Sequence, residues 1–585
     1  MLLVVAVLLI AVMIWAVPRS VQPGDAGEFA TIMLDGGVPH PSGYPWMRIL
    51  GFPARLFHAM GVPPATAAAL PCAAAGCLAW LLLHPILVRI AGAGVATFVV
   101  ALLGTASVVV VHTCDSEVWG PHLLMSSIVL RVALSKRQCS PLVLGLVLGL
   151  AVSHHLTAVL LVPLAVGAAW PSREPQDRWL VPLVSAGAKG IAGSALGLTA
   201  MATLAIGSGG HWRWGDTGTL SGLIHHISRA DYGVLQLSLH QEAVTVTDQW
   251  VRTAGSLGSA LTAGFTAAPL AGLVLTFGIC GFACWRRPAA LARGPWWGLM
   301  VTALATVVGF PALHNIDPTR VFGAWILERF DLLSLLVLSI PLAVALGPVS
   351  GWASDARRKT LLALLATALV GQQVYNTGRR GVASSDTFVE HYAVALLRTP
   401  TPGVRSVVFG TDDHRTFPVL YAQVVLGEGP DVLYIDASLL SHSWYRRMLR
   451  RSWPSLPDVD KPVRLMGAIW QSPDLAQTPI YLANNFSRPS ANLNRVPEGV
   501  LWRIVPPPSL ATAPPPLPAE IVELHRAALG RLRPMDGPPS LSAAHPFTGD
   551  LAAHYNEPTR RLITSLMATG HTDLAQALAD DLPPQ

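Results

Sequence analysis

Long apolar runs dominate the first 376 residues of this chain. A helix needs about 20 apolar residues to cross the hydrocarbon layer of a bilayer, which is roughly 30 Å thick. Charged residues make up only 13% of the chain, against about 25% in soluble globular proteins. This pattern excludes an ordinary cytosolic enzyme and predicts a polytopic α-helical membrane protein with about eleven transmembrane helices. The predicted spans are 1–17, 66–88, 91–111, 118–134, 141–153, 156–170, 180–206, 260–284, 296–313, 330–347 and 360–376.

The number of spans depends on 141–153 and 156–170, which are short and could together form one long helix or a re-entrant pair. Basic clusters set the expected orientation, because short cytoplasmic loops are enriched in Lys and Arg. With eleven spans and a cytoplasmic N-terminus, all four clusters are cytoplasmic. The clusters are Lys136/Arg137, Arg173/Arg178, Arg286/Arg287/Arg293 and Arg357/Arg358/Lys359. The tail after residue 376 then lies outside, with loops 18–65, 112–117, 154–155, 207–259 and 314–329.

The first run, MLLVVAVLLIAVMIWAV, is expected to stay in the membrane as a signal-anchor helix. It lacks the basic n-region and the A-x-A-like cleavage site of a signal peptide. Only 4 of the 40 basic residues are lysine, a bias that favours a bacterial inner-membrane protein whose outside loops are periplasmic. The arginines form short clusters between apolar runs, which indicates membrane topology and not nucleic-acid binding. Cys280 and Cys284, like the other four cysteines, lack zinc-type spacing and are expected to be buried as small hydrophobic side chains.

From about residue 377 the composition becomes that of a soluble, extracytoplasmic fold. Three strand-like runs, RSVVFG, DVLYIDASLL and PIYLANN, alternate with helix-like sequence and predict a small α/β domain. This region is expected to position the acceptor or to cover the site. The predicted domains are a transmembrane part (1–376), the α/β domain (377–504), a proline-rich linker (505–520) and a helical tail (521–585).

The first outside loop carries two acids directly after a membrane helix. Asp25 and Glu28 stand three residues apart in PGDAGEF, and His40 and Tyr44 follow in HPSGYP. A carboxylate partly shielded from water beside a bilayer is unfavourable, so its presence indicates a functional use. The alternative is structural, with Asp25 capping a short helix and Glu28 as its capping-box partner. Position in the sequence leaves both interpretations open.

The other outside loops hold further polar clusters, each of which alone is more often a solvated loop or a local ion pair. Because all of them emerge on the same predicted side, they could line one cavity. His226 and Arg229, three residues apart, are expected to share one helix face. The clusters contain Asp115, Glu117 and Trp119; His154 and His155; Trp214, Asp216, His225, His226, Arg229 and Tyr232; and Arg320, Glu328 and Arg329.

Such a cavity suits group transfer from a phosphorylated donor. Arg and His cations bind phosphate, a carboxylate takes a proton from an attacking hydroxyl, and Trp214 and Tyr44 can stack on a sugar ring. A membrane enzyme without cytoplasmic nucleotides needs a lipid-linked donor. No Walker A, G-x-G-x-x-G or H-E-x-x-H motif occurs in a suitable context, which weighs against an ATPase, a dehydrogenase and a zinc protease.

Several motifs occur in an order and at spacings that resemble one known family. They are DAGEF, HPSGYP, SEVW, GLAVSHHLT, WGD…HHISRADYG, ERF and, after the membrane part, VVFGTDDHRTFPVLYAQ…PDVLYID…WY. Over about residues 20–450 the chain is similar to the protein O-mannosyltransferase-like family of multi-span GT-C glycosyltransferases, which contains the vertebrate ER O-mannosyltransferase of plexin-type receptors. Two positions depart from the family pattern. Ser42 replaces the second proline of H-P-P-G-Y-P, and Trp119 stands at a tyrosine-like aromatic position.

The resemblance implies a GT-C fold with its active site on the extracytoplasmic face. The donor would be a polyprenyl-phosphate sugar, by analogy mannose, and the acceptor a hydroxyl of protein Ser or Thr or of a glycan; the need for a divalent metal stays open. The family's acid in the first outside loop maps onto Asp25, with Glu28 second, and deprotonates the acceptor in an inverting single displacement. Substrate-binding candidates, chosen by charge and location, are His40, Tyr44, Glu117, His154, His155, Trp214, Asp216, His226, Arg229, Tyr232, Arg320 and Arg329.

Three alternatives stay open at this point. A lipid-linked sugar flippase or other transporter would place ionisable groups near the bilayer midplane, whereas Lys189 and Arg131 lie toward the cytoplasmic ends of their predicted spans. A catalytically inert membrane-anchored binding protein would look much the same in sequence, and loss of activity on changing Asp25 would discriminate against it. An enzyme of the same class could use another polyprenyl-phosphate sugar or another acceptor.

Overall fold

The computed structural model of the chain divides into two compact units. Unit 1 comprises Met1–Pro18, Val38–Ser208 and Thr217–Ser384, and unit 2 comprises Arg19–Gly37, Gly209–Asp216 and Ser385–Gln585. Two segments of the predicted membrane part, 19–37 and 209–216, are therefore built into unit 2. The structure describes residues 1–136, 139–170, 180–206, 209–233, 245–265, 269–352, 355–380, 386–484, 493–507, 516–532 and 547–580.

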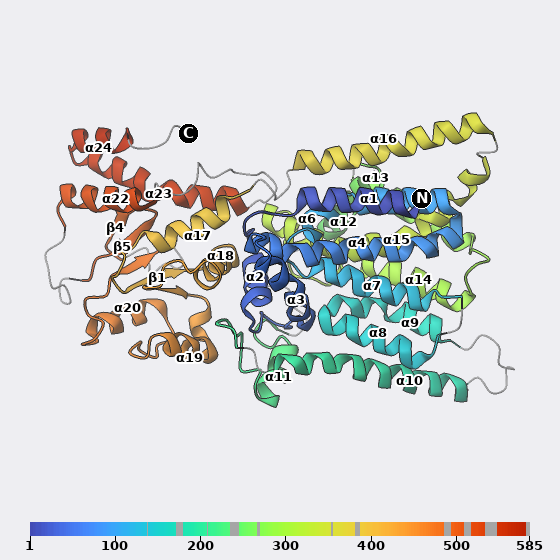
Figure 1. The fold of residues 1–585 in the computed structure, drawn as a ribbon, viewed down its shortest axis with the longest axis horizontal. Helices are drawn as coiled ribbons and strands as arrows, with labels where there is room; N and C mark the ends of the chain where they lie inside the picture. The colour runs from blue at the N-terminus through green and yellow to red at the C-terminus, as the bar shows by residue number, and fades with distance from the viewer. Residues whose placement is uncertain are drawn as a thin grey trace. The chain divides into compact units, whose positions relative to one another are not determined.

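Unit 1 is a bundle of helices (Figure 1). Leu, Val and Ala dominate its helices, as expected of helices that are apolar on every side. Its α-helices are α1 (Leu2–Ala16), α3 (Pro45–Ala59), α4 (Pro64–Ala91), α5 (Ala93–Gly104), α6 (Ser107–Thr113), α7 (Trp119–Ala133), α8 (Pro141–His154), α9 (Val162–Ala169), α10 (Leu180–Leu198), α11 (Leu220–Ile227), α12 (Val246–Leu261), α13 (Pro269–Trp285), α14 (Arg293–Leu304), α15 (Val321–Trp352) and α16 (Ala356–Arg380). The described part of the unit also contains the short 3₁₀ segments η1 (Leu156–Leu161) and η3 (Thr199–Leu204) and a π-helical segment, η4 (Ala305–Gly309).

In the described residues each predicted span overlaps a helix or consecutive helices. Among the described residues, α4 and Val321–Val349 of α15 are long and apolar enough to cross a membrane, and α5 and α6 qualify together as a pair bent by 62°. The total of eleven spans stays a prediction. The predicted start of span 260–284 is wrong, because α12 ends at Leu261 and a turn with positive φ at Ala263 and Gly264 follows.

Three regions of unit 1 are more helical than the sequence predicts. Most of helix α12, Val246–Leu261, lies within the predicted loop 207–259. Helix α3 lies within the predicted loop 18–65, and its Phe52 and Leu56 side chains are exposed, as is that of Met60 directly after it. Helix α15 begins at Val321, within the predicted loop 314–329. An amphipathic or partly charged helix does not give the long apolar run on which the span prediction depends.

Small residues allow α8 and α10 to run side by side at close range (Figure 1). A Cβ atom added to Gly149 of α8 would lie 2.2 Å from the carbonyl oxygen of Ser194, and one added to Gly193 of α10 would lie 2.1 Å from that of Leu142. Backbones this close leave no room for side chains, which is the packing mode of small residues in membrane helices.

Charged side chains in the first turns of α15 are paired with other elements of unit 1. Glu328 accepts from Arg380 of α16 at 2.6 Å, and Asp331 is bridged by Arg252 of α12 at 2.8 and 3.0 Å. Arg252 and Asp331 are 11% and 3% exposed. Because a buried charge is tolerated only when it is paired, these pairs fix the position of α15 against α12 and α16.

Unit 2 contains a five-stranded sheet in the order β2-β1-β3-β5-β4. The first three strands are parallel, and β3, β5 and β4 are antiparallel neighbours. Val407 and Val408 of β1 are fully buried, as the apolar run RSVVFG predicts. The strands are β1 (Ser406–Gly410), β2 (Val432–Asp436), β3 (Ile480–Leu482), β4 (Arg495–Glu498) and β5 (Leu501–Ile504). The three predicted strands are confirmed, and the β4–β5 hairpin was not predicted.

The helices of unit 2 include α17, which contributes Tyr392 and Leu396 to a core shared with the sheet. The described part of the predicted tail is helical, whereas half of the predicted linker, 508–515, lies outside the described residues. The helices are α2 (Ala26–Asp35), α17 (Phe388–Arg398), α18 (Asp413–Val424), η6 (Leu439–Ser441), α19 (Ser443–Ser452), α20 (Pro462–Gln471), α22 (Pro518–Leu532), α23 (Phe547–Ala568) and α24 (Thr572–Ala579).

Candidate active site

Asp25 stands at the N-cap position of α2. Its carbonyl oxygen accepts the first helical hydrogen bond, from the Phe29 N–H at 3.0 Å. Its side chain makes no capping hydrogen bond to the helix, although Asp is among the best capping residues. The carboxylate, which is partly exposed, is thus not used for the capping role that the structural alternative assigns to it.

Glu28, in the first turn of α2, is held by an aromatic side chain. The indole N–H of Trp212 donates to Glu28 Oε1 at 2.8 Å. Glu28 is 0% exposed and Trp212 is 4% exposed. A buried carboxylate needs such a donor, because an unsatisfied one is strongly unfavourable. Trp212 is not among the residues predicted from the sequence; its position two residues before Trp214 in the WRW motif was the available signal.

Trp212 lies in an aromatic cluster of unit 2. Its ring contacts those of Phe417 and Tyr445, each at 6.2 Å between centroids, and that of Trp444 at 6.4 Å. The predicted sugar-stacking residue Trp214 is only 3% exposed, and its ring packs on Trp444 at 5.1 Å. Trp214 therefore serves packing in this structure. Asp216, half-exposed, forms an ion pair with Arg447.

In unit 1, Tyr44 lies among histidines. Its ring centroid is 5.2 Å from that of His40, 6.1 Å from that of His154 and 5.9 Å from that of His155. The break between α8 and η1 presents the two adjacent histidines, as the SHHLT sequence predicts. His155 also contacts the rings of Trp119 and His122, both at 4.7 Å.

Some histidine ring nitrogens in this part of unit 1 are buried without a hydrogen-bond partner among the described residues. They are Nδ1 of His122, Nδ1 of His154 and both nitrogens of His226. The other nitrogen of His154 is hydrogen-bonded to the Val118 carbonyl at 3.0 Å, and that of His122 to Thr157 at 3.1 Å. A buried polar atom without a partner costs about 1–3 kcal/mol, so these nitrogens are suited to meet a polar ligand. His122 was not selected from the sequence, although it follows Trp119 by three residues.

The turn that carries Tyr44 packs against α11 and the residues after it. Gly43 has φ +97°, and a Cβ added there would lie 2.9 Å from His226 Nε2. Burial lowers the pKa of His226 to about 3, so its ring is neutral at neutral pH. The expectation that His226 and Arg229 share a helix face is wrong, because α11 ends at Ile227 and Arg229 adopts φ 56°.

Arg229 is nevertheless brought to the same turn. Its Nη1 donates to the Pro41 carbonyl at 3.1 Å, and its guanidinium lies over the Tyr232 ring at 5.0 Å. Unit 1 therefore unites seven of the predicted binding residues in one group, which we call the histidine–arginine group. Its members are His40, Tyr44, His154, His155, His226, Arg229 and Tyr232.

Glu117 and Arg329 form a buried ion pair beside this group. Their charged atoms lie 3.6 Å apart, and the Arg329 guanidinium stacks over Trp325 at 4.2 Å. Phe330, the next residue, contacts the Trp119 ring at 5.0 Å. The remaining predicted residue, Arg320, is 67% exposed and pairs locally with Asp317, so the structure does not bring it into the group.

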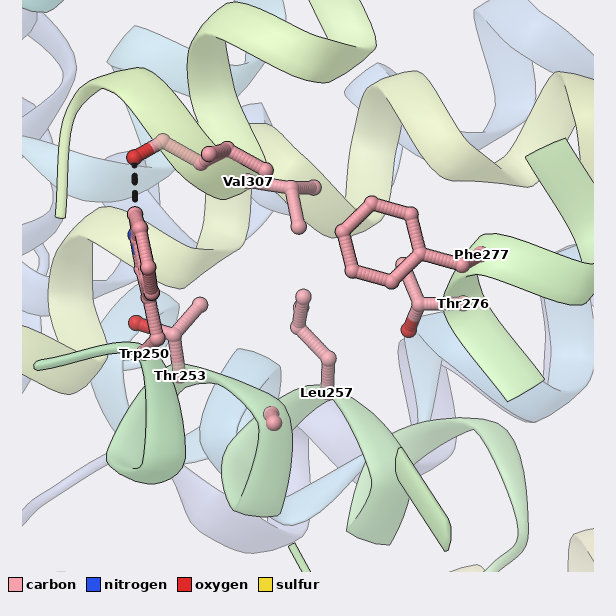
Figure 2. Close-up of a pocket in the computed structure, with 8 residues that line it drawn as sticks. Trp250, Thr253, Leu257, Thr276, Phe277 and Val307 are labelled. Atoms are coloured by element: carbon pink, nitrogen blue, oxygen red, sulfur yellow. Dashed lines mark hydrogen bonds between the residues drawn. The ribbon is translucent and has the colours of Figure 1, made fainter. Parts of the chain in front are cut away.

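An apolar cavity of about 250 Å³ lies elsewhere in unit 1, between α12, α13 and η4. Figure 2 shows Trp250 and Leu257 of α12 on one side of it, with Phe277 and Val307 opposite. The Trp250 indole donates to the Val308 carbonyl at 3.1 Å and closes one edge. No ionisable group lines this cavity among the described residues, so it suits a hydrocarbon chain.

In the part of the chain that the structure describes, no cluster of three or more His, Cys, Asp or Glu side chains has the arrangement of a metal site.

No protein-family model matches the chain. A curated relative, Protein O-mannosyl-transferase TMEM260 of Mus musculus, is 22% identical over 466 residues. The similarity covers 76% of this chain but 64% of the relative, so the chain spans less than two thirds of that protein's length.

Two solved structures share the fold. ArnT from Cupriavidus metallidurans bound to undecaprenyl phosphate is 12% identical with a TM-score of 0.52, and 88% of this chain and 99% of ArnT are covered. The apo state of the same protein gives 14% identity and a TM-score of 0.51, with 88% and 98% covered. The chain is thus an integral membrane protein with the fold of the GT-C glycosyltransferases and a homologue of a protein O-mannosyltransferase, as its ordered motifs predict.

Proposed function

We propose that this protein is a membrane glycosyltransferase that moves a sugar from a polyprenyl-phosphate donor to a hydroxyl acceptor. By analogy with the curated relative, the sugar is mannose and the acceptor is a Ser or Thr side chain of a protein. Undecaprenyl phosphate bound to the structural neighbour ArnT supports a polyprenyl-phosphate donor. In a bacterial cell the active site and the C-terminal domain face the periplasm.

The observation that carries the proposal is the Asp25 carboxylate. It follows the first membrane helix, stands at a helix N-cap without capping the helix, and has Glu28 one turn away. A carboxylate in such a place suits a general base better than a structural cap. The resemblance of DAGEF to the first-loop motif of the family supports the same assignment.

The chemistry is a single displacement at the anomeric carbon. The acceptor oxygen forms a bond to that carbon while its proton passes to Asp25. The bond from the carbon to the phosphate oxygen breaks, and its electron pair leaves with the polyprenyl phosphate. The configuration at the anomeric carbon is thereby inverted.

The histidine–arginine group supplies the donor contacts in this proposal. Arg229 offers a permanent positive charge, which stabilises the phosphate as negative charge develops on it. The neutral His226 ring offers a hydrogen bond instead of a charge. The unpartnered nitrogens of His122 and His154 suit sugar hydroxyls, which both donate and accept.

The apolar cavity between α12, α13 and η4 suits the polyprenyl chain. Each isoprene unit is hydrocarbon, so its transfer from lipid to an apolar cavity needs no polar partner. The phosphate and the chain of one donor would then be recognised by chemically different parts of unit 1.

The experiment is a donor comparison with the purified protein in liposomes. Radiolabelled polyprenyl-phosphate mannose, glucose and arabinose are each offered with periplasmic protein as acceptor, with and without EDTA. We expect transfer of mannose to protein, with an inverted linkage. Transfer of another sugar would change the donor but keep the class, and no transfer from any donor would refute the enzymatic proposal.

A further inference from the structure

Asp25 lies in the segment Arg19–Gly37, which contains α2 and which we call the α2 loop. The start of this loop is hydrogen-bonded to the C-terminal domain, the Ser385–Gln585 part of the same unit. The Val21 N–H donates to Glu390 Oε2 of α17 at 2.9 Å. The Ser20 hydroxyl and the Gln22 side-chain amide both donate to the Asp386 carbonyl oxygen, just before α17. Val21, Ser20 and Gln22 are at most 4% exposed. Hydrogen bonds to a carboxylate are about twice as strong as neutral ones, so Glu390 is the strongest anchor at this end.

The middle of the loop packs on α18 without a gap. A Cβ atom added to Gly27 would lie 2.4 Å from the carbonyl oxygen of Phe417 and 2.7 Å from the nitrogen of Pro418. These are backbone atoms of α18, which cannot swing away as a side chain would. Helix α2 is therefore seated directly on the α18 backbone, at a contact that only glycine permits.

The exit of the loop is fixed by the segment 209–216 of the same unit. The His211 N–H donates to Asp35 Oδ2 at 2.8 Å, and a Cβ added to Gly37 would lie 2.1 Å from the Trp212 carbonyl oxygen. The Trp212 side chain in turn holds Glu28 and packs on Phe417 of α18. The loop is thus held at its entrance, its middle and its exit by residues of unit 2.

We propose that the C-terminal domain positions Asp25, the candidate base. The positioning residues are Glu390 of α17 and Gly27 of α2, which packs on the backbone of α18. This inference rests on the proposed role of Asp25. In this proposal both positioning residues act through the α2 loop, by the Val21–Glu390 hydrogen bond and the Gly27–α18 contact. Because a displacement of about 1 Å can slow a reaction about 100-fold, the orientation of α2 on α17 and α18 sets the rate of the chemical step. The C-terminal domain is on this account a part of the catalytic machinery and not only a cover.

The test compares three changes with a matched control in the full-length protein. Glu390→Ala removes the acceptor of the Val21 N–H, whereas Glu390→Gln retains an acceptor oxygen. Gly27→Ala places a methyl group against the α18 backbone. Gly467→Ala is the control, because a Cβ on this helical glycine of α20 would meet nothing within 4 Å.

We expect kcat to fall about 10- to 100-fold in Glu390→Ala and Gly27→Ala, with KM for the lipid donor unchanged. Glu390→Gln should recover most of the rate, and Gly467→Ala should match the wild type. Wild-type kcat in a folded Glu390→Ala protein would overturn the proposal, as would a loss in Glu390→Ala that appears only in KM. If Gly27→Ala does not fold, the comparison of Glu390→Ala with Glu390→Gln decides.

Amide hydrogen exchange separates this inference from the proposed function, because it needs no activity. Exchange in residues 19–37 should rise in Glu390→Ala and not in Glu390→Gln. If the wild type transfers no sugar but this rise is observed, the proposed function fails and the anchoring stands. If Asp25→Asn abolishes transfer but Glu390→Ala changes neither exchange nor rate, the inference alone fails.

Discussion

Trp212 donates its indole N–H to Glu28 at 2.8 Å, across 184 positions of the chain. The bond joins the two segments of the predicted membrane part that belong to unit 2. It also places the second acid of the DAGEF motif in a fully buried site.

Replacing Trp212 by Phe should remove the indole N–H that donates to this buried carboxylate. We expect the free energy of unfolding to fall by about 2 kcal/mol, the usual value for a lost hydrogen bond to a charged group, and kcat to fall with it. The control is Trp470→Phe, in a partly buried tryptophan of the same unit. Chemical unfolding followed by intrinsic fluorescence measures both variants, and equal stability in Trp212→Phe and wild type would remove the energetic role of this bond.

The charge of Arg229 should matter for donor binding. Arg229→Gln removes the charge but keeps a polar side chain, so we expect KM for polyprenyl-phosphate mannose to rise about 10- to 100-fold, the equivalent of about 1.5–3 kcal/mol. Arg358→Gln, in an exposed arginine that forms an ion pair with nearby Asp355, should leave KM unchanged. Steady-state kinetics at saturating acceptor provide the measurement. An unchanged KM in Arg229→Gln would exclude a phosphate contact.

The buried Asp115 carboxyl should make stability depend on pH. It lies in the short loop between α6 and α7, and burial raises its pKa to about 7. The folded protein therefore holds this proton more tightly than the unfolded chain, whose Asp pKa is about 3.9. The stabilisation is complete at low pH and is lost as pH rises through about 7. We expect the thermal unfolding temperature in detergent to fall between about pH 4 and pH 7, and to fall less in Asp115→Asn. If the unfolding temperature falls equally with pH in the wild type and in Asp115→Asn, a protonated Asp115 is contradicted.

The cavity between α12, α13 and η4 can be tested by filling it. Val308→Trp adds bulk at its edge, so KM should rise about tenfold for a long polyprenyl donor and remain unchanged for a short-chain, water-soluble donor. Ile191→Trp makes the same kind of change on an exposed position of α10 and is the control. A donor chain-length series measures the difference. Equal KM values for the long donor in Val308→Trp and wild type would place the chain elsewhere.

The parts of the fold that the sequence predicts are those that depend on local patterns. The apolar runs predict helices, RSVVFG predicts strand β1, and SHHLT predicts the break at which His154 and His155 lie. The resemblance to the family pointed to Asp25 and to the residues around Tyr44.

The parts that the sequence misses depend on contacts between distant segments. Nothing local in DAGEF indicates that Gly27 packs on Phe417 or that Trp212 holds Glu28, because these contacts join residues far apart in the chain. Arg229 was misplaced on a helix face because the i,i+3 spacing does not reveal that α11 ends two residues earlier. Trp214 was assigned to sugar stacking because an aromatic side chain in a loop looks the same whether it faces a ligand or the aromatic cluster of its own domain.

The most direct test of the account is the rate of mannose transfer by Asp25→Asn, with Asp573→Asn as the matched control. Both changes remove one carboxylate from the start of a helix of unit 2, and Asp573 is exposed in the first turn of α24. At equal expression and thermal stability, we predict that Asp25→Asn lowers kcat about 100- to 10,000-fold, the range for loss of a general base, and that Asp573→Asn retains the wild-type rate. Transfer at the wild-type rate in Asp25→Asn would contradict the central claim that this carboxylate takes the proton of the acceptor.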